Sequence, residues 1–280
     1  MDMSKKPLAV VKVGGDVLLG EAERQGISNN IYDLIEADWQ VIVLHGGGPQ
    51  TNRLQQQLGM TPNKVAGRRI TSESDLIVVE QAICGEVNVA LTQLLQDKAI
   101  NAFGCNGASG KIIIAEKRPP RVVSGAGADA IDFGEVGDVT AINSKLLQGL
   151  LDLELVPVIA TLGVEKNSGR VFNINADTTV VQIARAMQAD LLLLTTAVGA
   201  IYKDLSSPET RIAKVNATEA RQLIVDGIIQ GGMIPKVEEA LSVLKDGVKK
   251  IAIVGPQQSG AFISVARDEG TLGTLIDAGS

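Results

Sequence analysis

Two short apolar runs in the first fifty residues each end in a cluster of glycines. Leu8–Gly15 is LAVVKVGG and Val41–Pro49 is VIVLHGGGP. Short runs rich in Val, Ile and Leu predict strands of a parallel sheet that is covered on both faces. Glycine lets a ligand oxygen reach backbone N–H groups because no Cβ intervenes. The sequence therefore predicts two backbone cradles at one sheet edge, and Lys12 adds a positive charge beside the first.

The composition limits both the core and the possible partners. Hydrophobic residues make up 45% of the 280 residues and aromatic residues only 2%, so aliphatic side chains must build the core. The net charge of −6 argues against a general nucleic-acid binder. Cys84 and Cys105 lack the spacing of a zinc site and are expected to be reduced thiols of a cytoplasmic protein. No apolar run approaches the ~20 residues of a spanning helix, so no membrane association is expected.

Strand-like and helix-like segments alternate along most of the chain, which predicts an α/β protein with a mostly parallel sheet. Strands are predicted at Leu8–Val13, Val41–Leu44, Ile112–Ala115, Val156–Ala160, Leu191–Thr195 and Ile251–Val254. Helices are predicted at Ser74–Gln96, Ala141–Leu153, Asp177–Met187, Thr218–Asp226 and Val237–Lys245. The stretch Glu116–Glu135 has no sustained period and predicts an irregular hairpin or loop on the surface. If the chain has two lobes, they meet near Gly169–Asn173.

Two later motifs supply charged side chains. NINADTT (Asn173–Thr179) places Asp177 just before a helical run, where it could cap the helix, and Asn173 offers an amide for a polar ligand. GGMIPK (Gly231–Lys236) is another glycine turn and ends in a lysine. Two lysines held by an aspartate suit phosphoryl transfer, because the spreading negative charge of the phosphoryl group needs neutralisation. The only histidine, His45, has no recognisable catalytic partners and is expected to pack beneath the glycine turn.

In this order, the motifs resemble those of the amino acid kinase family over nearly the whole chain. The matching motifs are KVGG (Lys12–Gly15), HGGGP (His45–Pro49), GRRIT (Gly67–Thr71), GEVN (Gly85–Asn88), NINAD (Asn173–Asp177) and GGMIPK (Gly231–Lys236). The resemblance implies a three-layer αβα sandwich with a mainly parallel central sheet. It also implies an N-terminal lobe, residues 1–170, that binds the acyl acceptor and dimerises, and a C-terminal lobe, residues 171–280, that binds ATP.

The resemblance assigns roles to individual residues. Lys12, Lys236 and Asp177 would be catalytic, with Asp177 organising the two lysines. The acceptor would be bound by Gly47, Gly48, Arg69 and Asn173, and Arg69 would pair with its α-carboxylate. The nucleotide would be bound by Lys12, Gly14, Gly15, Thr195, Gly199, Gly232 and Lys236. No dedicated metal ligand is expected, because Mg²⁺ would arrive with ATP.

The implied reaction moves the γ-phosphoryl group of ATP to the γ-carboxylate of N-acetyl-L-glutamate, a step of arginine biosynthesis. Two alternatives remain open: a kinase for a related acid such as N-acetyl-2-aminoadipate, and a catalytically weak paralogue that binds metabolites. A homodimer is expected. Because only about seven residues precede the first strand, the resemblance implies a dimer that is insensitive to arginine. Whether a PII-type regulator binds is undecided.

Three departures from the family pattern fall near the predicted site. Thr196 stands where the family commonly has aspartate, and Ala108 and Ser109 stand where it has lysine and aspartate. Glu135 occupies a position that is usually apolar. These changes predict either an altered acceptor choice or sequence drift without functional effect.

Overall fold

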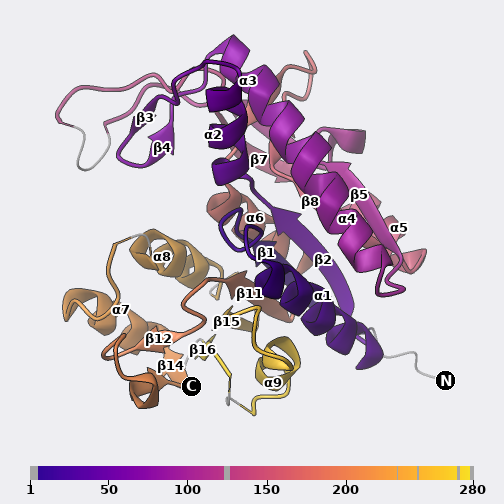
Figure 1. The fold of residues 1–280 in the computed structure, drawn as a ribbon, viewed down its shortest axis with the longest axis vertical. Coiled ribbons are helices and arrows are strands. Elements are labelled where there is room, and N and C mark those ends of the chain that lie inside the picture. The colour runs from indigo at the N-terminus through magenta and orange to yellow at the C-terminus, as the bar shows by residue number, and fades with distance from the viewer. Residues whose placement is uncertain (1–5, 123–126, 232, 245, 270–271, 278–280) are drawn as a thin grey trace.

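An eight-stranded sheet forms the centre of the computed structural model, which describes residues 6–122, 127–231, 233–244, 246–269 and 272–277 (Figure 1). The strand order is β14 (Lys214–Asn216), β16 (Thr274–Asp277), β15 (Lys250–Val254), β11 (Leu191–Thr195), β1 (Leu8–Val13), β2 (Gln40–His45), β8 (Val156–Ala160) and β5 (Ala102–Asn106). The strands from β15 to β5 are parallel, whereas β16 is antiparallel to β15 and parallel to β14. The predicted mainly parallel sheet is therefore confirmed.

Helices cover both faces of this sheet, which confirms the predicted three-layer sandwich. One face carries α1 (Glu21–Glu36), α4 (Asn88–Gln96) and α9 (Ala261–Ala266). The other carries α5 (Ser144–Asp152), α6 (Ala176–Met187) and α8 (Met233–Leu244), with α7 (Ala217–Val225) packed against α8. Successive side chains of a strand point to opposite faces. Accordingly, Leu8 and Val10 of β1 belong to the core beneath α5, α6 and α8, whereas Ala9 and Val11 belong to the core beneath α1, α4 and α9.

A smaller four-stranded sheet corrects one strand prediction. Its order is β10 (Val171–Asn173), β9 (Leu162–Val164), β6 (Ile113–Lys117) and β7 (Gly137–Ile142). The strand predicted at Ile112–Ala115 exists as β6, but it pairs antiparallel with β7 and lies outside the central sheet. The helix predicted at Ala141–Leu153 was placed too early, because β7 runs to Ile142 and the Asn143 side chain then caps α5. Within the surface segment between β6 and β7, one bridge joins Arg121 to Ile131, and residues 123–126 lie outside the described part.

The long helix predicted at Ser74–Gln96 is continuous in direction but not in type. It consists of α3 (Glu73–Glu80), a π-helical segment η1 (Gln81–Val87) and α4. A capping box at Ser72 and Asp75 starts α3. The wider π turn lies where η1 packs against α2 (Gly48–Gln57), beneath the second glycine turn. Single π turns of this kind are frequent next to functional sites.

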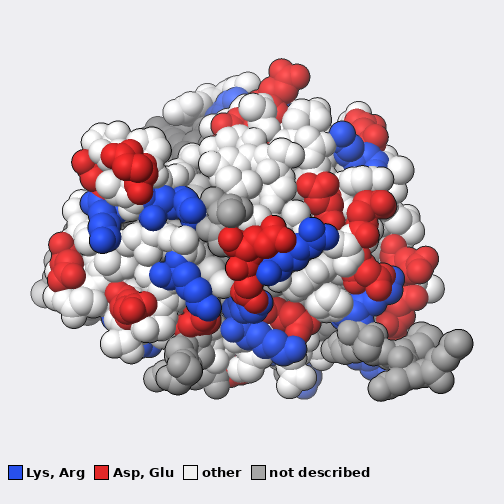
Figure 2. Space-filling model, turned by 90° about the horizontal axis from the view of Figure 1, so that it is seen from below, with Lys and Arg blue, Asp and Glu red and all other residues white. Residues whose placement is uncertain are grey.

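The strands of residues 1–170 and those of residues 171–280 occupy separate halves of the central sheet, which adjoin where β1 pairs with β11. The binding roles given to these two parts stay predictions. None of the described helices combines the length and the apolar character needed to cross a membrane. Figure 2 shows Lys and Arg side chains interspersed with Asp and Glu on one face, so the described part of that face has no broad field of one sign.

Candidate functional site

Both predicted glycine cradles lie at the carboxyl edge of the central sheet. The first follows β1 and the second follows β2, and these strands are adjacent and parallel. A Cβ on Gly15 would lie 2.9 Å from the Cα of Gly47, so the two turns touch through their backbones. A side chain on Gly47 would also collide with Ile83 of η1. Glycine is therefore required here to let two ligand-facing loops pack directly against each other.

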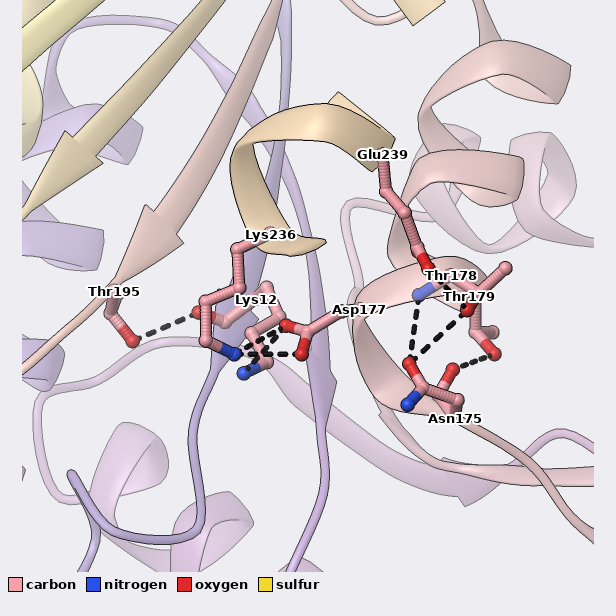
Figure 3. Close-up of polar contacts among 8 residues, drawn as sticks. All are labelled: Lys12, Asn175, Asp177, Thr178, Thr179, Thr195, Lys236 and Glu239. Atoms are coloured by element: carbon pink, nitrogen blue, oxygen red, sulfur yellow. Dashed lines mark hydrogen bonds and ion pairs between the residues drawn. The ribbon is translucent and has the colours of Figure 1, made fainter. Parts of the chain in front are cut away.

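Lys12, Asp177 and Lys236 meet at this edge (Figure 3). Lys12 comes from β1, Asp177 from the first turn of α6 and Lys236 from the first turn of α8. The Lys236 ammonium donates to both Asp177 carboxylate oxygens at 2.8 and 2.7 Å, and Lys12 Nζ lies 3.0 Å from Asp177 Oδ1. Asn175 caps α6 by accepting from the Thr178 N–H, so the alternative of Asp177 as the cap is wrong. The Asp177 carboxylate is thus left for the lysines.

The cluster of Lys12, Asp177 and Lys236 keeps one unit of net positive charge, since two ammonium groups face one carboxylate. Burial alone would raise the pKa of Asp177, but the charges and hydrogen bonds of Lys12 and Lys236 outweigh it and lower that pKa. Burial lowers the pKa of Lys12, and the neighbouring Lys236 charge adds to this, although Asp177 opposes it. The side chain of Lys12 is only 8% exposed. A cation that is costly to bury gains most from an incoming anion.

A cavity of about 540 Å³ opens on one side of the cluster and suits a ligand as large as a nucleotide. Its lining includes Lys12, Lys236, Thr195 and Thr196. The lining also includes apolar side chains, among them Ala200, Ile201, Ile228, Ile229 and Met233, and the polar or charged residues Lys203, Asp204 and Gln230. The cavity thus offers both apolar side chains and ammonium groups, as an aromatic base bearing phosphates requires.

The predicted nucleotide residues differ in how close they come to this cavity. Thr195 lines it and donates to the Lys12 carbonyl at 2.9 Å, which ties β11 to β1. Gly199 turns the backbone beside it with φ of 81°, and its N–H donates to Thr196 Oγ1 at 3.0 Å. Gly14 and Gly15 are not part of its lining, although Lys12 and Asp16 on either side of them are. Gly232 lies outside the described residues.

A second cavity, of about 220 Å³, is lined by every residue predicted to bind the acceptor. Gly47, Gly48, Arg69 and Asn173 all line it. The N-termini of α2 and α6 also face it, because Gly48 and Ala176 begin those helices. Helix N-termini favour negative charge through their free N–H groups and their dipole. This cavity therefore suits a small anion.

Hydrogen bonds to neighbouring side chains fix the orientation of Arg69 in the wall of the smaller cavity. Its guanidinium donates to Asn52 Oδ1 at 2.5 Å and also to the Gln55 side-chain oxygen. Among the described residues it makes no ion pair, and burial lowers its pKa. Neutral groups orient Arg69, and the nearby Asp75 charge acts on it without forming an ion pair, so the guanidinium remains available for a carboxylate. Asn173 donates to Thr71 Oγ1 at 3.1 Å in the same wall.

The positions that depart from the family pattern differ in whether they line one of the two cavities. Thr196 lines the larger cavity and supports the Gly199 turn. Ala108 and Ser109 line neither cavity, and their N–H groups donate to Asn106 Oδ1 within their own loop. Glu135 pairs with Arg170 through both carboxylate oxygens and also lines neither cavity. Of these positions, only Thr196 lies beside a predicted ligand.

His45 has the structural role that the sequence predicts. It is fully buried, with Nδ1 2.9 Å from the Gly46 carbonyl and Nε2 2.9 Å from the Asn88 amide nitrogen. Burial lowers its pKa to about 4, with a small opposing effect of the Gly46 carbonyl. A neutral imidazole that donates from Nδ1 and accepts at Nε2 satisfies both neighbours.

Several lining residues were not predicted from the sequence. In the smaller cavity these include Arg68, Arg118, Thr161 and Asn175. Asn175 lies within the NINAD motif, and its position before a helix could have identified it as a cap. Arg118 and Thr161 come from strand ends whose proximity depends on the smaller sheet, which the sequence does not predict. The described residues contain no cluster of three or more His, Cys, Asp or Glu side chains that could hold a metal ion.

Known proteins share this fold and much of this sequence. The sequence model described as the amino acid kinase family matches residues 7–255. A protein named acetylglutamate kinase from Anaeromyxobacter dehalogenans (strain 2CP-C) is 38% identical over 268 residues, which cover 96% of this chain and 98% of the relative. A protein of the same name from Methanocaldococcus jannaschii is 34% identical and covers 95% and 89%, respectively.

A solved structure extends the comparison to three dimensions. The protein smu.665 from Streptococcus mutans UA159 superposes with a TM-score of 0.75 at 27% identity, over 97% of this chain and 99% of the other. The match therefore spans both halves of the central sheet and both cavities, and is not confined to one motif. The chain belongs to the amino acid kinase family.

Proposed function

We propose that this protein is an acetylglutamate kinase, which transfers the γ-phosphoryl group of ATP to the γ-carboxylate of N-acetyl-L-glutamate in arginine biosynthesis. Near full-length relatives of that name, at 34% and 38% identity, support the assignment. The observation that carries it is that Lys12 and Lys236 line the larger cavity, while Asp177, which pairs with both, directly follows Ala176 in the lining of the smaller one. Two reactants held on opposite sides of a cationic cluster can meet in line.

The larger cavity is proposed to bind ATP and the smaller one the acyl acceptor. In this assignment residues 171–280 supply most of the nucleotide site and residues 1–170 most of the acceptor site. The apolar side chains of Ile201 and Met233 receive the adenine, and the phosphates extend toward Lys12 and Lys236. Gly14, Gly15, Thr195, Gly199 and Gly232 are the further proposed nucleotide residues.

The acceptor is proposed to lie with its two carboxylates at opposite ends of the smaller cavity. Arg69 pairs with the α-carboxylate, because a guanidinium matches two carboxylate oxygens at once. Gly47 and Gly48 offer backbone N–H groups at the start of α2, and Asn173 contacts the amide region. The γ-carboxylate then points toward Asp177 and the lysines.

The reaction needs charge stabilisation and positioning more than proton transfer. A carboxylate acceptor is already ionised at neutral pH, so no general base is required. The carboxylate oxygen forms a bond to phosphorus while the bond to the ADP oxygen breaks, and negative charge spreads over the phosphoryl oxygens. Lys12 and Lys236 stabilise that charge, and Asp177 holds the two ammonium groups in place before the phosphoryl group arrives.

Mg²⁺ is proposed to accompany the nucleotide. Among the described residues no carboxylate cluster forms a dedicated site, but Asp16 and Asp204 line the nucleotide cavity and carry the oxygen ligands that Mg²⁺ favours. When bound, the ion would neutralise part of the phosphate charge. The roles proposed for Lys12, Lys236 and Asp177 do not depend on its position.

We also propose a homodimer that acts in the cytoplasm on small molecules. Exposed apolar side chains at Ile77, Val89 and Phe103 lie on α3, α4 and the edge strand β5, and an apolar surface of this kind suits a protein contact. Both cysteines are free thiols, which fits a reducing compartment. Light scattering tests the dimer, and it would also reveal a hexamer.

The decisive experiment is ATP-dependent acyl phosphate formation, trapped as the hydroxamate, with N-acetyl-L-glutamate and N-acetyl-2-aminoadipate in parallel. A clear preference for the glutamate derivative supports the proposal. A preference for the longer acid would reassign the substrate, since one methylene changes selectivity by only about 10–200-fold. Turnover of neither acid, together with intact ATP binding, would instead indicate a metabolite-binding paralogue.

A further inference from the structure

A second link joins α6 to α8 next to the lysine cluster. Thr178 follows Asp177 on α6, and Glu239 lies one helical turn beyond Lys236 on α8. Thr178 Oγ1 lies 3.3 Å from Glu239 Oε1 (Figure 3). Residues i and i+3 share a helix face, so α8 presents an ammonium and a carboxyl group to consecutive residues of α6. The helix that carries Lys236 is therefore attached at two points.

If Glu239 is ionised, the Thr178 hydroxyl faces two hydrogen-bond acceptors but has only one proton to donate. Thr178 Oγ1 is also 3.2 Å from Asn175 Oδ1, the oxygen that caps α6. A hydroxyl group has one proton and can donate to only one of these two oxygens. In addition, Glu239 Oε2 is buried and has no hydrogen-bond partner among the described residues. An ionised carboxylate with a buried oxygen that lacks a hydrogen-bond partner would destabilise the folded protein.

A protonated Glu239 resolves this shortage. Its carboxyl group donates to Thr178 Oγ1, and Thr178 then donates to Asn175 Oδ1, so both contacts become hydrogen bonds. Protonation also preserves the charge of the cluster. Lys12, Lys236 and Asp177 sum to +1, and an ionised Glu239 would reduce the local sum to zero.

We propose that Glu239 is a positioning residue of the phosphoryl-transfer centre that works in its protonated form. It holds α8 against α6 through Thr178 while the Lys236 ammonium turns from Asp177 to the phosphoryl oxygens. Loss of its proton weakens this link and places a negative charge beside the cluster. The inference deepens the proposed function and rests on it.

Charged groups from several elements act on Glu239. They are Asp177 on α6, Lys236 on α8, Arg68 on β4 (Arg68–Arg69) and Arg121 in the segment between β6 and β7. Burial raises the pKa of Glu239 most, and the Asp177 charge raises it further, whereas Thr178, Arg68 and Lys236 act in the opposite direction. The resulting pKa is above the ordinary glutamate value, in agreement with the hydrogen-bond geometry.

The first test is the pH profile of kcat for the wild type and Glu239→Gln, with saturating ATP and N-acetyl-L-glutamate. In the wild type, kcat is expected to fall on the order of tenfold as pH rises through the pKa of Glu239, with acceptor KM unchanged within about twofold. Glutamine is a neutral donor of similar shape, so this fall should be absent in the variant. Glu238→Gln, at the exposed neighbouring position on α8, is the matched control and should retain the wild-type profile.

Two variants of Thr178 separate the hydrogen bond from packing. Thr178→Val removes the hydroxyl at nearly constant volume and is expected to lower kcat about tenfold at pH values below the pKa of Glu239, with a smaller effect above it, whereas Thr178→Ser should restore kcat. Equal pH profiles for the wild type and Glu239→Gln, or full activity of Thr178→Val, would overturn the proposal.

A second measurement does not depend on turnover. A carboxyl group whose pKa is raised by folding binds its proton more tightly in the folded protein, so its contribution to stability decreases as pH rises from the unfolded to the folded pKa. The Tm of Glu239→Gln minus that of the wild type should therefore increase over this pH range, and a constant difference would refute the protonated form. An inactive wild type with the expected Tm behaviour would indicate that the proposed substrate is wrong, not the state of Glu239.

Discussion

Replacing Lys236 by alanine tests the charge arrangement most directly. The cluster then contains one ammonium and one carboxylate, and its net charge falls from +1 to zero. Two unit charges 4 Å apart interact by about 4 kcal/mol at an effective dielectric constant of 20. Lys236 is 25% exposed, and Lys12 remains beside the phosphoryl group, so about half to three quarters of this energy should be lost from the transition state. At 1.36 kcal/mol for each factor of ten, kcat should fall on the order of 30- to 200-fold.

The assay is steady-state ADP production with each substrate varied in turn. Acceptor KM should change by less than about threefold, because the lysine acts mainly on charge that develops in the transition state. Lys249→Ala is the matched control, since its ammonium pairs with Asp190 on the exposed surface and is 71% exposed. An unchanged kcat with a large increase in acceptor KM would refute the reasoning, because Lys236 would then serve ground-state binding.

Three further perturbations test other parts of the site. Arg69→Ala should raise acceptor KM on the order of 30-fold with a smaller effect on kcat, because it removes a charge-assisted contact; an unchanged KM in the same assay would reject the carboxylate assignment. The low pKa of His45, about 4, predicts stability that is complete above pH 6.5 and decreases by about 3 kcal/mol as pH falls through 4, because the folded protein resists protonation. The free energy of unfolding, measured with urea at each pH, should show this loss in the wild type but not in His45→Gln. The same pH dependence in both proteins would exclude this role of His45. Gly199→Ala should raise ATP KM and lower Tm, because φ is 81° and the new Cβ would lie 3.0 Å from Gly255. The control Gly169→Ala has φ of 76° but open space and should lower Tm by less, leaving KM unchanged.

The sequence predicts the strands of the central sheet best where burial on both faces produces uninterrupted apolar runs. Leu8–Val13 and Leu191–Thr195 coincide with β1 and β11. By contrast, α1 and α2 were missed because their exposed faces carry many polar residues and their apolar spacing is weak. The smaller sheet was missed because its strands are short and pair across long stretches of sequence. Register between distant segments depends on tertiary packing, which local patterns do not record.

The proximity of Lys12, Asp177 and Lys236 was predicted better than the elements that carry them. Glycine turns and charged motifs identify Lys12, Gly47, Asp177 and Lys236 without knowledge of the smaller sheet. The sequence does not show that Asn175, rather than Asp177, caps α6, because both residue types favour that position. Nor does it reveal Glu239, because a glutamate on a helix is ordinary until the orphaned Oε2 and the neighbouring Thr178 are seen together.

The pairing of β1 with β11 has a mechanical consequence. Four residue pairs, from Ala9–Leu191 to Lys12–Leu194, join the two halves of the sheet directly below the lysine cluster. A hinge made of loose chain could open widely, but a hydrogen-bonded ladder resists stretching and yields mainly by twisting. The two cavities should therefore approach and separate by a small rotation about this seam, with Lys12 close to the axis. A residue near a rotation axis hardly moves, so Lys12 should keep its position in the sheet while Lys236 moves with α8.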